Sequence, residues 1–131
     1  MKIAYCFYGQ SRTFKHCYNN FFKNVFVDKS DIFLHCWTSN RQEEKALLKA
    51  YKPKKFLFEN QPDFSYCNEK FTSFNYYFPN NAKCPQVNQC AQLLSAKKSF
   101  SCLEEYEKEN NFKYDFVIRT RYDVLYNDPI D

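Results

Sequence analysis

The stretch YDFVIRTRYDVLY, residues 114–126, decides the expected fold of this chain. It begins with an unbroken apolar run, which is typical of a buried strand, and turns polar at Arg119, Arg121 and Asp123, where the strand should end. In an open α/β sheet, ligands bind beyond the carboxyl ends of the strands, so charges at this position favour an anionic ligand. The alternative is an ion-pair cluster that joins either arginine to Asp115 or Asp123 and closes the sheet edge.

Residues 2–8 form the first expected strand, because β-branched and aromatic residues run directly into Gly9, the only glycine of the chain. A polar turn then leads into a helix over 14–27, in which apolar side chains recur every three or four positions. Ser11 or Thr13 is expected to cap this helix. Strand, glycine turn and helix make up the first half of a βαβ unit, although the glycine patterns of a P-loop and of a dinucleotide fingerprint are absent.

Residues 31–37 and 55–59 are two further apolar segments, and they predict the second and third strands. A helix is expected between them. It begins with a capping-box pattern at Ser39 or Asn40, and it ends before Pro53, because proline cannot continue a helix. Strand and helix therefore continue to alternate along the chain.

A long irregular segment, residues 60–85, separates the third strand from the longest predicted helix, residues 86–110. Loops of this length inside a domain are usually functional or disordered. We favour a loop over the carboxyl edge of the sheet, and an insertion that merely covers the core is the alternative. One side of the long helix is polar with little charge and includes Lys98, which indicates that it faces a partly buried site.

The alternation of strands and helices predicts one α/β domain over residues 1–131, a three-layer αβα structure with a mostly parallel, Rossmann-like sheet. Polar residues follow each strand and should meet at one edge of the sheet: Gln10 and Arg12, His35, Glu59 and Asn60, and the charged residues of 119–123. This convergence favours the functional interpretation of the opening stretch. We expect His35 to be a hydrogen-bonded residue at the end of its strand, with a catalytic base as the alternative.

The composition argues against several classes of protein. A net charge of +4 is too small and too dispersed to predict nucleic-acid binding, and no apolar run is long enough to span a membrane. The seven cysteines are scattered without a Cys-x-x-Cys pair, so we expect free thiols in a reducing, cytoplasmic compartment. A zinc site at Cys67, Cys84 and Cys90 is the alternative.

Three segments, in the right order, resemble a known family. Residues 5–13 (YCFYGQSRT) resemble the G-Q-x-R-T start of glycosyltransferase-like proteins of large viruses and some bacteria. Residues 31–37 (DIFLHCW) are similar to their second strand, and residues 114–123 (YDFVIRTRYD) are similar to their Y-D-x-V-I-R-x-R-x-D segment. The resemblance implies a GT-A fold and covers its amino-terminal, nucleotide-binding part. The acceptor side of such enzymes lies downstream, so we expect the chain to be truncated relative to them.

The same resemblance implies a binding site. In such enzymes an Asp-x-Asp motif holds a divalent ion, Mg²⁺ or Mn²⁺, against the diphosphate of a nucleotide-sugar. Here Arg121 stands in place of the first aspartate, and Asp123 is the implied metal ligand. The alternative is that the arginines bind the phosphates directly. The residues implied to bind the donor are Gly9, Gln10, Arg12, Lys98, Arg119 and Arg121.

The function implied by the resemblance is transfer of a sugar from a nucleotide-diphosphate sugar to a glycan or another acceptor. The sequence assigns no catalytic base. One alternative is a non-catalytic domain that only binds the nucleotide-sugar. The other is an interaction module for carbohydrate or protein, which would use the aromatic residues of 60–85.

Overall fold

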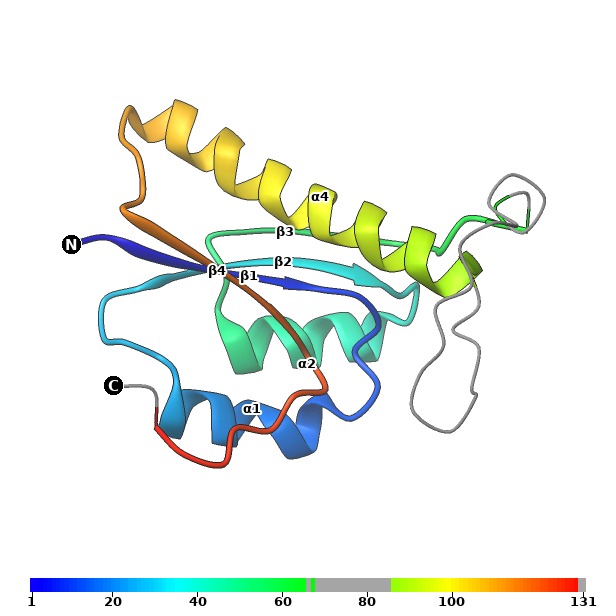
Figure 1. The fold of residues 1–131 in the computed structure, drawn as a ribbon, viewed down its shortest axis with the longest axis horizontal. Helices are drawn as coiled ribbons and strands as arrows, with labels where there is room; N and C mark the ends of the chain where they lie inside the picture. Colours follow the sequence, from blue (N-terminus) through cyan, green and yellow to red (C-terminus); the bar gives the residue numbers. More distant parts are fainter. Residues whose placement is uncertain (66, 68–85, 130–131) are drawn as a thin grey trace.

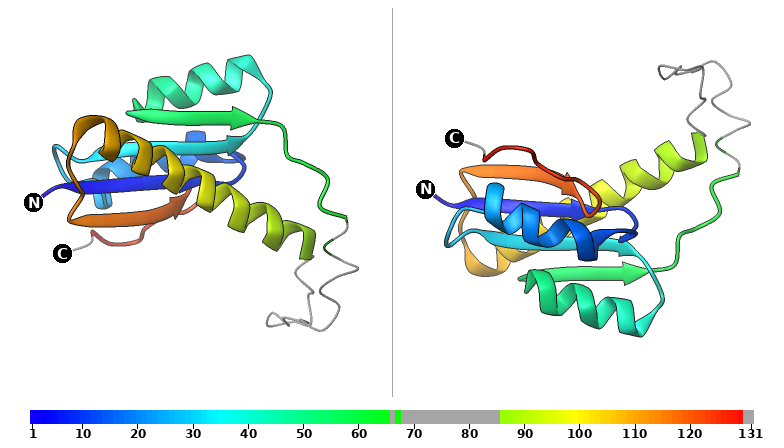
Figure 2. Two further views of the ribbon diagram at one scale, coloured as in Figure 1. Left: turned by 90° about the horizontal axis from the view of Figure 1, so that it is seen from above. Right: turned by 90° about the horizontal axis from the view of Figure 1, so that it is seen from below.

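The chain forms a three-layer α/β structure around a parallel sheet (Figure 1). The computed structural model describes residues 1–65, 67 and 86–129. In this described part the sheet has four strands in the order β3-β2-β1-β4: β1 (Ile3–Tyr8), β2 (Asp31–Trp37), β3 (Lys55–Glu59) and β4 (Phe116–Arg121). One face is covered by α1 (Phe14–Asn24) and α2 (Arg41–Tyr51), and the other by α4 (Gln86–Asn110; Figure 2). The predicted fold class is confirmed.

The strand β1 can lie inside the sheet because its side chains are apolar toward both faces. Tyr5 and Phe7 point toward α1 and α2, where their ring centroids lie 5.1 Å and 4.9 Å from that of Phe21. Ala4 and Cys6 point toward α4. Burial of each large apolar side chain contributes about 1.5–3 kcal/mol. One unbroken apolar strand therefore contributes to the core on both sides of the sheet.

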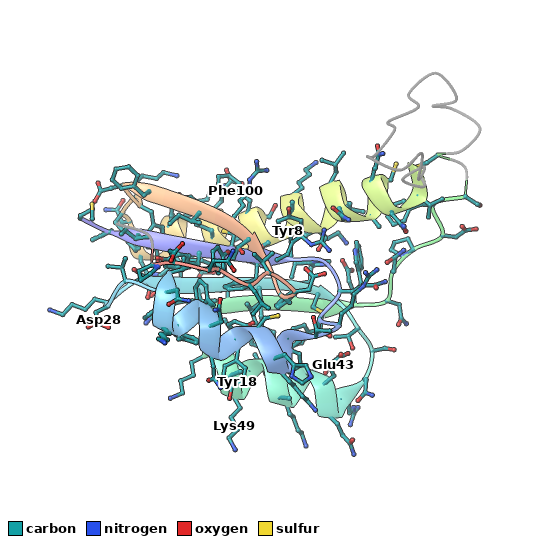
Figure 3. All side chains as sticks on the ribbon, turned by 60° about the horizontal axis from the view of Figure 1, so that its bottom comes forward. Tyr8, Tyr18, Asp28, Glu43, Lys49 and Phe100 are labelled. Atoms are coloured by element: carbon teal, nitrogen blue, oxygen red, sulfur yellow. The ribbon has the colours of Figure 1, made fainter. Side chains whose placement is uncertain are left out.

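The two helices on the first face begin in different ways. Asn40, one of the two predicted caps, caps α2, since its side chain accepts hydrogen bonds from the backbone N–H groups of the second and third helix residues. The reciprocal bond of a capping box does not form, because the backbone N–H of Asn40 donates to Thr38. The predicted side-chain cap of α1 is wrong: Thr13 occupies the cap position without such a bond, and Ser11 Oγ donates to Glu43 on α2 instead (Glu43 is labelled in Figure 3). A carboxylate is a stronger acceptor than a neutral group, which explains this choice. Helix α1 also ends at Asn24, earlier than predicted.

The apolar run of β4 is less buried than the sequence predicts. Phe116 is 58% exposed and Val117 is 37% exposed. The reason is that β4 is an edge strand, and α4 packs over β1, β2 and β3 instead. The carboxyl end of β4 is nevertheless anchored, because Tyr122 is buried and its hydroxyl donates to the backbone carbonyl of His35 with an O···O distance of 2.8 Å.

The strand order creates a topological switch point between β1 and β4. From β1 the chain continues to β2 and β3 on one side, and it then returns to pair β4 with the opposite side of β1. The segment after β4 passes onto the face that α1 covers, where the backbone of Tyr126 is hydrogen-bonded to the side chains of Asn20 and Asn24. In open α/β sheets, the crevice at such a point is where ligands bind.

Three sequence expectations concern features outside the sheet. Within the described ranges, no helix combines the length and the apolar character that crossing a membrane requires. The predicted loop over the carboxyl edge lies mostly outside the described residues, which include only 60–65 and 67 of it. The six cysteines of the described part are free thiols, and Cys84, the third member of the alternative zinc site, lies outside that part.

Candidate anion-binding site

A pocket of about 250 Å³ lies beyond the carboxyl ends of β1 and β4. Its wall contains Arg12, from the turn between β1 and α1, and Arg121, the last residue of β4. The described residues of the wall include no aspartate or glutamate. The other polar side chains are neutral amides: Gln10, Gln61, Asn88 and Gln92. The pocket is therefore positively charged and rich in hydrogen-bond donors.

The turn between β1 and α1 has a strained backbone where it lines the pocket. Gly9 has a φ of +102°, and a Cβ atom added there would meet nothing within 4 Å, so backbone geometry rather than space requires glycine. Arg12 has a φ of +33°, and this region costs a residue with a side chain about 1–2 kcal/mol. Arg12 Nε donates to Gln10 Oε1 at 3.1 Å, and Gln10 Nε2 donates to Gln61 Oε1 at 3.1 Å. Strain of this kind is concentrated at ligand-binding turns.

Arg121 is held by an ion pair at the end of β4. Its Nε donates to Asp123 Oδ1 at 2.9 Å and its Nη2 donates to Asp123 Oδ2 at 2.7 Å. No described residue accepts a hydrogen bond from Nη1. The side chain of Asp123 is 19% exposed and that of Arg121 is 37% exposed, so the guanidinium group is the more open partner. The ion pair considered from the sequence therefore forms, and Arg121 still faces the pocket.

The described residues do not fit the divalent-metal site that the resemblance implies. Both carboxylate oxygens of Asp123 already accept hydrogen bonds from Arg121. Across the described ranges there is no group of three His, Cys, Asp or Glu side chains that could hold a metal ion. Mg²⁺ and Mn²⁺ need several oxygen ligands, and the two arginines of the pocket would repel a cation. The arrangement suits an anion.

A buried polar network, which we call the relay, runs beneath the pocket. The backbone N–H of Gly9 donates to Ser95 Oγ at 2.7 Å, and Ser95 Oγ lies 2.6 Å from His35 Nδ1. On the other side of the ring, His35 Nε2 lies 3.0 Å from Glu59 Oε1, which also binds the ammonium group of Lys98. Ser95 and His35 are fully buried. The relay therefore ties the turn after β1 to α4 and to the strands β2 and β3.

The hydrogen bonds of the relay assign the protonation of His35. The carboxylate of Glu59 can only accept, so the proton of the neutral ring lies on Nε2. Nδ1 is then the acceptor for the hydroxyl proton of Ser95, whose oxygen accepts from Gly9. Burial lowers the pKa of His35 below its ordinary value of 6.5, although Glu59 opposes this effect. Burial raises the pKa of Glu59, but the hydrogen bonds from Lys98 and His35 outweigh burial and lower that pKa below 4.5. His35 is thus a hydrogen-bonded strand residue, as predicted.

The structure brings only some of the predicted donor-binding residues together. Those that line the pocket are Gly9, Gln10, Arg12 and Arg121. Lys98 does not line it: its Nζ binds Glu59 and lies 5.4 Å from the ring centroid of Trp37. Arg119 faces an adjoining hollow between α4 and β4, and Gln92 belongs to the walls of both.

Sequence reasoning did not single out several residues of the site. Asn88 and Ala91 line the pocket, and no sequence signal marks them as site residues, whereas Gln61 belongs to the polar residues that follow the third strand. Trp37 carries a signal, because it is the last residue of β2 and shares a face of that strand with His35. Ser95 lies on the polar side of α4 that the sequence predicts to face a partly buried site, and the structure buries it against His35.

The chain was compared with known protein families, curated proteins and solved structures. No protein-family model matches the chain, and no curated protein or solved structure matches it significantly.

Proposed function

We propose that the pocket binds the diphosphate of a nucleotide-sugar and that the protein transfers the sugar to an acceptor. The observation that carries the proposal is the convergence of three separate sequence segments on one pocket. Residues 5–13 supply Gly9, Gln10 and Arg12, residues 31–37 supply Trp37, and residues 114–123 supply Arg121. These are the segments that resemble the glycosyltransferase-like proteins.

The charge of the pocket supports an anionic ligand of this kind. Its described wall contains the guanidinium groups of Arg12 and Arg121 and no carboxylate. Guanidinium groups bind phosphate oxygens through paired N–H donors, and hydrogen bonds to charged groups contribute about 1.5–3 kcal/mol. In sugar transfer the nucleoside diphosphate leaves as an anion, so the same arginines would stabilise the charge that develops.

The size of the pocket suits part of a donor molecule. Its volume of about 250 Å³ is below the range of about 300–1,000 Å³ that is typical of small-molecule sites. The adjoining hollow beside Arg119 and Gln92 continues the binding surface along α4. The proposal therefore assigns the diphosphate to the pocket and the rest of the donor to the surface around it.

One observation favours a second candidate, a domain that binds the donor without transferring the sugar. Among the described residues, the pocket wall contains no carboxylate or histidine that could accept a proton from an acceptor hydroxyl. Release of nucleoside diphosphate from a bound donor in the presence of mixed acceptors supports the transferase. Binding without any release supports the second candidate.

Isothermal titration calorimetry with UDP, GDP, CDP, dTDP and their common sugar conjugates tests the proposed function. The wild type should bind at least one of these ligands, and Arg12→Ala should weaken that binding about ten- to a hundredfold, because one charge-assisted contact is lost. Lys49→Ala is a matched control, since it removes an exposed cation from the outer surface of α2 (Figure 3). A folded wild type that binds nothing in the panel contradicts the proposed function.

A further inference from the structure

A nucleotide-sugar carries a negatively charged diphosphate, and that charge must be neutralised where it binds. We propose that the pocket binds the diphosphate without a divalent cation, through Arg12 and Arg121, and that Asp123 positions Arg121 instead of holding a metal. This inference rests on the proposed function, because it concerns the same ligand in the same pocket.

The geometry of the ion pair leaves Arg121 ready to bind an anion. Asp123 occupies the guanidinium edge formed by Nε and Nη2, at 2.9 Å and 2.7 Å. The other edge, formed by Nη1 and the second N–H of Nη2, is left for phosphate oxygens. Because Asp123 already orders the long side chain, less conformational freedom is lost when the ligand binds.

The relative exposure of the two side chains shows which of them a ligand meets. Arg121 lines the pocket and is 37% exposed, whereas Asp123 is 19% exposed and does not belong to the pocket wall. A cation that coordinated Asp123 would have to displace Arg121 from both carboxylate oxygens. The displaced guanidinium group would then lie beside the cation, with mutual repulsion. Metal binding is therefore opposed at this position.

The two arginines have different parts in the proposed site. The charge of Arg121 is offset in part by Asp123, so this residue contributes mainly directed N–H groups. Arg12 is hydrogen-bonded to the neutral amide of Gln10 and is exposed, so its charge is not offset by this partner. Together they supply both the orientation and the net positive charge that a diphosphate needs.

Calorimetry on the full chain tests the inference without any activity assay. Metal-stripped protein in EDTA is titrated with inorganic pyrophosphate and with the nucleotide panel, and both titrations are repeated with Mg²⁺ or Mn²⁺ in excess of the chelator. The dissociation constants should agree within about threefold, and Mn²⁺ titrated alone into the protein should give no binding heat.

The outcomes separate this inference from the proposed function. A tightening of about tenfold or more by Mg²⁺ or Mn²⁺ overturns the inference and leaves the proposed function intact. Binding of pyrophosphate in EDTA, with no nucleotide bound under either condition, supports the metal-free site and contradicts the proposed function. Absence of binding by every probe under both conditions overturns both.

A double-mutant cycle tests whether Asp123 acts through Arg121. Asp123→Glu keeps the charge near the ligand but changes the geometry of the ion pair, so it should weaken pyrophosphate binding in EDTA about three- to tenfold. In an Arg121→Ala background the same substitution should have no effect. Asp128→Glu is the control, because Asp128 is exposed. If Asp123→Glu weakens binding equally in both backgrounds, Asp123 is not a positioning residue for Arg121.

Discussion

Replacement of Ser95 by alanine tests the relay beneath the pocket most directly. The substitution removes one oxygen atom and leaves the backbone of α4 unchanged. That atom, Ser95 Oγ, accepts a hydrogen bond from the backbone N–H of Gly9, with an N···O distance of 2.7 Å. It is also hydrogen-bonded to His35 Nδ1, at 2.6 Å. Gly9, Ser95 and His35 are all buried, so water cannot easily replace the lost bonds. Ser95→Ala should therefore leave two buried polar groups without partners.

The expected loss of stability follows from these two groups. Each buried polar group that is left without a partner costs about 1–3 kcal/mol, so Ser95→Ala should lower the free energy of unfolding by about 2–6 kcal/mol. Domains of this size are stable by about 5–15 kcal/mol, so the loss is a large part of the total. For a chain of this length each kcal/mol corresponds to roughly 4 °C, and the Tm should fall by about 8–24 °C.

Ser99→Ala is the matched control on the same helix. Ser99 is also buried, but its hydrogen bonds are weak: its Oγ lies 3.5 Å from the backbone oxygen of Phe33, and its other partner is the thiol of Cys6. Both substitutions remove the same atom from the same face of α4, and Ser99→Ala should cost less than about 1 kcal/mol. Urea unfolding of the two variants and the wild type measures the difference. Equal losses would refute the role assigned to Ser95.

Amide hydrogen exchange gives an independent readout of the same prediction. Gly9 is the only glycine of the chain, so glycine-selective ¹⁵N labelling gives one amide signal, and that signal reports on the turn that lines the pocket. Its exchange should become faster in Ser95→Ala and stay unchanged in Ser99→Ala. Unchanged exchange in Ser95→Ala would show that Ser95 does not hold the turn.

Two further predictions concern the same part of the chain. Burial lowers the pKa of His35, so below its ordinary value of 6.5 the unfolded chain binds the proton first and stability should fall. Because the pKa of Glu59 is lowered, the free energy of unfolding should fall again below pH 4.5. Urea unfolding across this pH range measures both decreases in stability, and His35→Gln should remove the decrease that is due to His35. Gly9→Ala should cost about 1–2 kcal/mol in urea unfolding, because φ is +102°. If Gly9→Ala leaves the free energy of unfolding unchanged, the turn adopts a different backbone conformation in the variant.

The order and type of the elements could be predicted from the sequence because they depend on local patterns. Apolar runs that end at turn residues identify the strands, and apolar spacings of three and four identify the helices. The cap at Asn40 was predictable for the same reason, since a side-chain oxygen beside the first N–H groups of a helix acts over a few residues. The cap of α1 was not, because Ser11 has a charged acceptor on another helix, at Glu43.

The sequence also located part of the candidate site. Gly9, Gln10, Arg12 and Arg121 follow strands that the alternation predicts to be parallel, and the residues after parallel strands meet at one edge. The sequence did not decide whether Arg121 pairs with Asp123 or faces a ligand. The structure shows that Arg121 pairs with Asp123 through the edge formed by Nε and Nη2 and also lines the pocket.

By itself, then, the sequence determined a parallel α/β domain with basic residues at the carboxyl ends of β1 and β4. The tertiary structure alone decided that β4 is an exposed edge strand, that Lys98 binds Glu59 instead of lining the pocket, and that Ser95 meets His35. The last pair is separated by 60 positions along the chain. The physical reason is that local patterns depend on neighbouring residues, whereas these features depend on strand order and on how α4 crosses the sheet.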